Sequence, residues 1–78
     1  MNWELYRSKK RAAARYLEDA AQDMVRCGRA ESYGDYRGAE EYLERARYSQ
    51  DQAARLEHEL LLMKGQEERK CRMKSIAL

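Results

Sequence analysis

Apolar positions recur every three or four residues in two long stretches of the chain, which meet at a turn around Tyr33-Gly34-Asp35. This alternating spacing keeps side chains on one face of a helix. No segment alternates with a period of two, so no strands are expected. The pattern predicts an all-α fold, an antiparallel two-helix hairpin. The two stripes are Trp3, Tyr6, Lys10, Ala13, Leu17, Ala20, Met24 and Cys27, followed by Ala39, Tyr42, Ala46, Ser49, Ala53, Leu56, Leu60 and Met63.

Capping residues set the expected helix boundaries. Asn2 and Asp35 are suited to begin the two helices, because their side chains accept hydrogen bonds from N–H groups of the first turn. We expect helices at about 3–30 and 36–64. Gly65 is expected to end or bend the second helix, although the residues after it allow a continuation to 75. The 78 residues form a single helical-hairpin domain, 1–78.

A turn near residue 34 fixes which positions lie opposite each other. Residue numbers of opposing positions then sum to about 68. Large side chains meet small ones, for example Leu17 opposite Ala53 and Met24 opposite Ala46, which lets the helices approach closely. Cys27 and Cys71 lie roughly 45 Å apart in this arrangement, too far for a disulfide within the chain.

More apolar residues are present than the stripes use. A two-helix unit of this size is marginal alone, and the extra surface would remain in water. Packing two hairpins into a four-helix bundle with coiled-coil contacts would bury it, so we expect a homodimer. The alternative is a groove that binds a partner protein. The extra residues are Ala12, Ala14, Tyr16, Ala21, Val25, Tyr48, Ala54, Leu61 and Leu62.

The net charge of +2 is unevenly distributed. Segment 1–15 has five cations and one acid, segment 64–78 has five cations and two acids, and segment 16–63 has six arginines and eleven acids. A hairpin gathers the two basic segments at the end away from the turn. Together with Trp3 and Tyr6, this end suits phosphate binding and base stacking, although the same cations also solubilise helix ends. The candidate nucleic-acid contacts are Arg7, Lys9, Lys10, Arg11, Lys70, Arg72 and Lys74.

The turn is a second candidate contact site. Tyr33 and Tyr36 flank it and are expected to be exposed, and exposed aromatic side chains are frequent hot spots of protein interfaces. Acidic residues lie on the same stretch of chain. The candidate contacts for a protein partner are therefore Tyr33, Asp35, Tyr36, Glu40 and Glu44.

Residues suited to catalysis or metal binding are few. His58 is the one histidine, and its neighbours Glu57 and Glu59 point to other faces of the helix. Arg55 stands three residues before His58, where a helical metal site would place a glutamate. The chain has no Cys-x-x-Cys or His-x₃-His spacing and no phosphate-binding glycine loop. We expect no enzyme activity, no cofactor and no metal.

The chain also lacks signals for membranes or secretion. The longest apolar run, Leu60-Leu61-Leu62-Met63, is far too short to span a bilayer. The first residues lack the charged start and long apolar stretch of a signal peptide. We expect a cytoplasmic protein that does not contact a membrane.

Two resemblances add to this interpretation. Segment 33–46 resembles the second helix of a tetratricopeptide repeat through Gly34-Asp35-Tyr36, Ala39, Tyr42 and Ala46, but the chain holds no second copy. The likeness implies a shared way of starting a helix hairpin. The whole chain more loosely resembles the small, helical, arginine-rich accessory proteins of temperate phages, which implies binding to a host protein.

The sequence as a whole favours binding over catalysis. We expect a small protein–protein interaction module (an adaptor, inhibitor or regulator of a partner protein) that acts as a homodimer. The alternative is a nucleic-acid-binding accessory protein that uses the basic segments at both ends of the chain.

Overall fold

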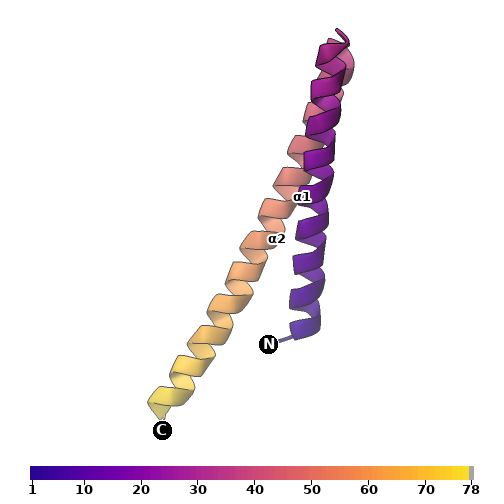
Figure 1. The fold of residues 1–78 in the computed structure, drawn as a ribbon. Helices are drawn as coiled ribbons and strands as arrows, with labels where there is room; N and C mark the ends of the chain where they lie inside the picture. Colours follow the sequence, from indigo (N-terminus) through magenta and orange to yellow (C-terminus); the bar gives the residue numbers. More distant parts are fainter. Residues whose placement is uncertain (78) are drawn as a thin grey trace.

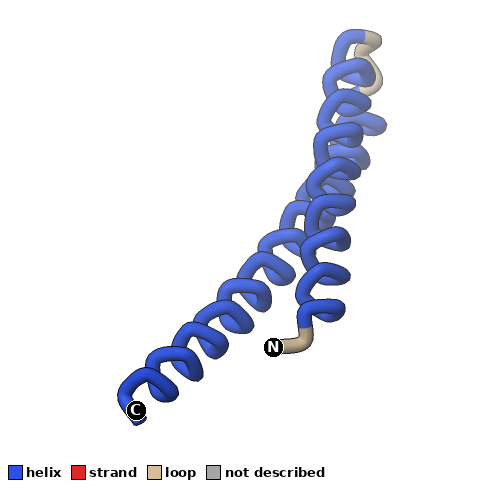
Figure 2. The backbone as a smooth tube through the Cα atoms, turned by 60° about the horizontal axis from the view of Figure 1, so that its bottom comes forward, coloured by secondary structure: helices blue, strands red, loops and turns tan. Residues whose placement is uncertain are grey.

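The protein is a hairpin of two long helices, α1 (Trp3–Ser32) and α2 (Tyr36–Ala77), which run antiparallel (Figure 1). The computed structural model describes the backbone of residues 1–77 and the side chains of residues 1–69. Figure 2 shows that only the N-terminal residues and the turn between the helices are non-helical in this part of the chain. The predicted all-α hairpin is confirmed, and its second helix continues through Gly65.

The helices begin at the predicted caps. The Leu5 N–H donates to the Asn2 side chain at 3.1 Å, and the Gly38 N–H donates to the Asp35 carboxylate at 2.9 Å. A Cβ at position 38 would clash with that carboxylate, so glycine leaves room for this cap. Gly34 takes the left-handed conformation at φ 75°, which reverses the chain.

Gly34 and Gly28 are therefore expected to respond oppositely to alanine. Gly34→Ala forces a side chain into the left-handed region and is expected to lower the free energy of unfolding by about 1–2 kcal/mol. Gly28→Ala lies inside α1 with no atom within 4 Å of the new Cβ, and is expected to raise it by up to about 1 kcal/mol. Urea unfolding measures both changes, and a stabilising Gly34→Ala would contradict the turn.

Three ion pairs between the helices define their register. They join the N-terminal amine to Glu67 at 3.2 Å, Lys9 to Glu59 at 2.6 Å and Arg45 to Asp23 at 3.9 Å. In each pair the residue numbers sum to 68, as a turn at residue 34 requires. Because α2 continues from Glu67 to Ala77, it extends beyond the start of α1.

Small side chains fill the contact line between the helices, which we call the seam. Every apolar residue buried there is alanine or cysteine, and among residues 1–69 no large side chain is fully buried. The positions repeat every seven residues on each helix, as in coiled coils. Alanine allows the helix axes to approach closely but buries little surface. The buried residues are Ala13, Ala20, Asp23 and Cys27 on α1 and Ala39, Ala46, Ser49 and Ala53 on α2.

The predicted stripe is correct for α2 and half wrong for α1. Leu17 and Met24 are 47% and 45% exposed, while Tyr16 is partly buried and Asp23 is buried. The predicted and the observed contact lines of α1 share the positions that repeat every seven residues, such as Ala20. They differ in the residue between these positions: the prediction takes the fourth residue after each, as in Leu17 and Met24, whereas the structure uses the third, as in Tyr16 and Asp23. The seam uses the other flank, so Leu17 and Met24 do not lie opposite α2 as expected.

The helices lie closest near the turn and diverge towards the N-terminus (Figure 1). The size of the seam residues accounts for this divergence. Most of the buried alanine, cysteine and serine residues lie in the half near the turn, whereas the half near the N-terminus contains more large, partly buried side chains, such as Tyr6, Leu56, Leu60 and Met63. Larger side chains between two helices increase the distance between their axes.

Candidate interaction surfaces

The turn presents two exposed aromatic side chains. Tyr33 is 88% exposed and Tyr36 is 73% exposed, as the sequence predicts. Glu40 and Glu44 are also exposed, on the first turns of α2. The structure thus brings the five candidate partner contacts together at one end of the hairpin. Asp35 differs from the rest because its carboxylate already accepts the Gly38 N–H.

The basic end is partly neutralised by acids of α2. Lys9 Nζ donates to Glu59 Oε2 at 2.6 Å, and this hydrogen bond and charge hold the pKa of Glu59 below its ordinary value. Glu67 pairs with the N-terminal amine. Arg7, Lys10 and Arg11 are exposed on α1. The remaining predicted nucleic-acid contacts lie outside the side chains that the structure describes: Lys70, Arg72 and Lys74.

Trp3 and Tyr6 contact each other at the same end. Their ring centroids are 5.6 Å apart with the planes at 76°, an edge-to-face arrangement. Trp3 remains 51% exposed, so its side chain can still contact another molecule. Because Arg7 follows Tyr6 directly and Lys10 lies one turn further along α1, an exposed aromatic ring and exposed cations share this part of the molecule.

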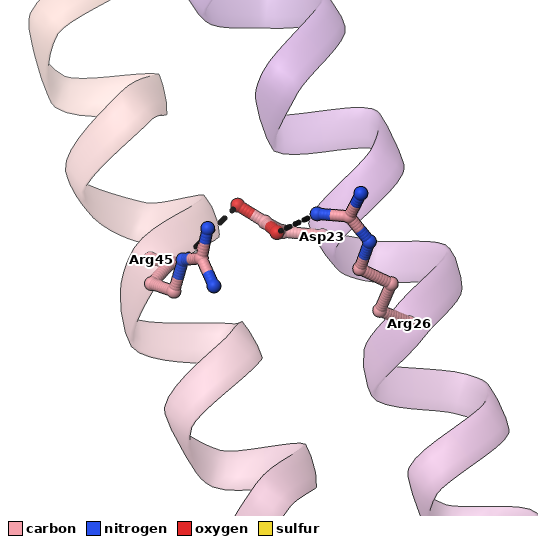
Figure 3. Close-up of polar contacts among 3 residues, drawn as sticks. All are labelled: Asp23, Arg26 and Arg45. Carbon is pink, nitrogen blue, oxygen red and sulfur yellow. Dashed lines mark hydrogen bonds and ion pairs between the residues drawn. The ribbon is translucent and has the colours of Figure 1, made fainter.

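A polar groove runs along one side of the hairpin, in the half near the turn. Asp23 lies at its base, and Figure 3 shows its carboxylate between Arg26 of α1, at 3.2 Å, and Arg45 of α2, at 3.9 Å. The Asp23 side chain is only 6% exposed, whereas the two arginines are 49% and 63% exposed. The other groove residues are Asp19, Gln22, Glu41, Glu44, Tyr48 and Ser49.

Asp23 is the buried charge that the sequence interpretation missed. Its neighbour Met24 was assigned to the seam because it is apolar. The available signal was the register, since Asp23 and Arg45 are opposing positions in a hairpin that turns at residue 34. An acid and a base at opposing positions stabilise one alignment of two helices over its shifted alternatives. The ion pair therefore adds to the specificity of the register.

Cys27 is a buried thiol on α1, near the turn. Its Sγ donates to Glu31 Oε1 at 3.7 Å. Burial raises the pKa of the Cys27 thiol above its ordinary value, and the Glu31 carboxylate raises the pKa further. Since the thiolate is the reactive form, this environment suppresses reaction. The predicted distance between Cys27 and Cys71 involves a side chain outside the described residues.

Cys27 is consequently expected to react slowly with a thiol reagent such as DTNB while the protein is folded. In a Cys71→Ser variant, which reports Cys27 alone, the reaction at pH 8 should be at least about tenfold slower in buffer than in urea. Free cysteine in the same two solutions corrects for the solvent. Equal corrected rates would show that Cys27 is accessible in the folded protein.

Ten large apolar side chains among residues 1–69 are at least 45% exposed. They occur on both helices and at the turn, so the exposed apolar surface extends along the molecule. A monomeric soluble protein rarely exposes a large continuous apolar patch. The ten are Trp3, Leu5, Leu17, Met24, Val25, Tyr33, Tyr36, Tyr48, Leu61 and Leu62.

His58 is exposed on α2. Within residues 1–69, no three or more histidine, cysteine or acidic side chains converge closely enough to hold a metal ion. No helix in the described part of the chain is long and apolar enough to cross a bilayer. In the comparisons with known proteins, no family model, no curated protein and no solved structure matches this chain.

Proposed function

We propose that this protein is a small, cytoplasmic, non-catalytic protein–protein interaction module that acts as a homodimer, with two hairpins packed into a four-helix bundle. One observation carries the proposal. The buried residues of the hairpin are all small, apart from Asp23, while ten large apolar side chains among residues 1–69 are exposed. A second layer of helices would bury part of that surface and add the stabilisation that a short hairpin lacks.

The oligomeric state is tested by light scattering coupled to size-exclusion chromatography. A homodimer gives twice the chain mass of 9.3 kDa and dissociates on dilution. A stable species of 9.3 kDa at high protein concentration would refute the dimer.

The turn is the proposed contact for the partner protein. Tyr33 and Tyr36 are the two most exposed of the large apolar side chains, and Glu40 and Glu44 add negative charge beside them. Such a surface would serve an adaptor, inhibitor or regulator. The resemblance to accessory proteins of temperate phages makes a host protein the expected partner.

Affinity capture from host lysate tests this contact. The double variant Tyr33→Ser/Tyr36→Ser should lose proteins that the natural sequence retains, because it removes both exposed rings but keeps the Asp35 cap. Tyr48→Ser is the matched control, since Tyr48 is 61% exposed in the polar groove but follows Tyr36 by twelve residues on α2. Equal capture by the natural sequence and the double variant would remove the turn as the binding site.

Nucleic-acid binding is the second candidate, supported by the exposed cations beside Trp3. Arg7, Lys10 and Arg11 are exposed, whereas Lys9 is already paired with Glu59. Affinity for generic DNA and RNA at two salt concentrations separates the candidates. Micromolar binding with a steep salt dependence would favour this function, and no binding at low salt would exclude it.

A further inference from the structure

The two sides of the hairpin differ in chemistry. On one side of the seam lies the polar groove. A second, smaller groove lies on the other side, near the N-terminus, and brings Tyr6 of α1 next to α2, where it is lined by Glu57, Leu60, Leu61 and Lys64. Tyr6 and Leu61 therefore each belong to a line of side chains, one along α1 and one along α2, that lies on this second side of the hairpin.

Each line carries apolar side chains at several turns, although Arg47, Gln50 and Glu57 lie between those of α2. Leu17 and Met24 follow Tyr6 by 11 and 18 residues, close to three and five full turns of about 3.6 residues, so the three side chains share one line of α1. Leu43 precedes Leu61 by 18 residues and shares its line on α2. We call this side the apolar face; it comprises Leu17, Ala21, Met24 and Val25 on α1 and Leu43, Ala54 and Leu61 on α2.

We infer that a second copy of this chain docks on the apolar face in the antiparallel direction, with the turn of each hairpin towards the N-terminal end of the other. This inference rests on the proposed homodimer and specifies its face and direction. The polar groove and the turn then remain open on the outside of the four-helix bundle.

Charge determines the direction. Segments 1–15 and 64–78 carry balances of +4 and +3, and their described residues lie in the half of the hairpin away from the turn, whereas segment 16–63 carries −5. Parallel hairpins would place two such basic ends side by side, and like charges at short range repel. Antiparallel hairpins separate the basic ends and bring each towards the acidic part of its partner. The two copies then use the same surface, as two-fold symmetry requires.

The broad side of the hairpin offers the area that a dimer needs. The hairpin measures 67 × 17 × 12 Å, so the whole broad side projects on the order of 1,000 Å², against about 800 Å² that each partner buries in a standard interface. The apolar face is the central part of this side, because Leu43 and Leu61 lie about 27 Å apart along α2, and residues around it would complete the interface. The face also mixes large side chains, such as Leu17 and Leu61, with the small Ala21 and Ala54. Such alternation lets helices from two layers interdigitate.

Matched lysine substitutions test the face. Met24→Lys and Leu61→Lys each introduce a charge on the apolar face and are expected to raise the dimer dissociation constant at least about tenfold. Tyr48→Lys introduces the same residue on the opposite side and should leave the constant unchanged. Sedimentation equilibrium measures the constants, and circular dichroism checks that each variant remains helical. If both variants, Met24→Lys and Leu61→Lys, remain helical and keep the dissociation constant of the natural sequence, the assigned face is wrong although the protein is a homodimer.

Spin-label distances test the direction without disturbing the face. A label is placed at Tyr33→Cys in a Cys27→Ser/Cys71→Ser background, since Tyr33 is 88% exposed at the turn. With the two-fold axis near Ala21, the labels of an antiparallel dimer lie roughly 35–40 Å apart, at about 1.5 Å per residue. Parallel hairpins would bring them within about 20 Å, which would overturn the direction. A monomer in every experiment would instead refute the proposed homodimer itself.

Discussion

Ala53→Leu is expected to lower the free energy of unfolding by about 1–3 kcal/mol. Ala53 is 1% exposed in the seam, near the middle of the hairpin. Three additional carbon atoms fit there only if the helices separate, which would also disturb neighbouring alanine contacts. Urea unfolding at one fixed protein concentration measures the change, because the stability of a dimer depends on concentration.

Ala14→Leu is the matched control. It makes the same substitution on α1, at an exposed position that belongs to neither the seam nor the apolar face. Stability should stay the same or rise, since leucine retains high helix propensity and adds apolar surface outside the seam. Equal losses in both variants would show that the helices do not pack along the line through Ala39, Ala46 and Ala53.

The second large effect concerns the buried carboxylate of Asp23. Replacing Arg26 and Arg45 together by methionine is expected to cost about 1–3 kcal/mol at pH 7. The substitution leaves an almost fully buried charge without either of the cations that lie within 4 Å of it. Thermal and urea unfolding of the double variant measure the loss.

A third substitution identifies the cause. Adding Asp23→Asn to the Arg26→Met/Arg45→Met variant removes the buried charge and should restore most of the lost stability. Asp23→Asn alone should change little, because Arg26 and Arg45 are exposed enough to be solvated by water. If the double and triple variants were equally unstable, the loss would come from the arginine side chains and not from the stranded carboxylate.

The register of the hairpin was predictable from the sequence, but the flank used by α1 was not. Gly34 and the caps at Asn2 and Asp35 fixed the turn and the opposing positions. On α1, apolarity favoured Leu17 and Met24 over their neighbours. The hairpin instead buries the flank with Asp23, because the pairing with Arg45 compensates the charge and Asp23 is smaller than Met24.

The positions of glycine in the sequence do not predict where the helices end. Gly28 and Gly65 both lie inside helices, although glycine readily takes the left-handed conformation that ends many helices. A helical glycine costs about 1 kcal/mol, which good helix formers on both sides can outweigh. Gly34 differs because the chain reverses there and requires a positive φ.

The candidate contacts were predicted unevenly. The exposure of Tyr33 and Tyr36 followed from their place beside the turn, and both are exposed. The engagement of Lys9 by Glu59 joins residues fifty positions apart and depends on the register as well as on side-chain rotamers. The charge pattern of one helix therefore overstates how many cations of the basic end are available to a ligand.

The alanine-rich seam has a calorimetric consequence. Heat capacity rises on unfolding mainly because carbon surface becomes hydrated, by about 0.45 cal/mol/K for each Å². The seam of residues 1–69 buries little carbon surface, so the free energy of unfolding of a single hairpin should change only slowly with temperature. A strongly curved profile with detectable cold denaturation would then originate from contacts between chains, and its curvature would measure how much carbon surface those contacts remove from water.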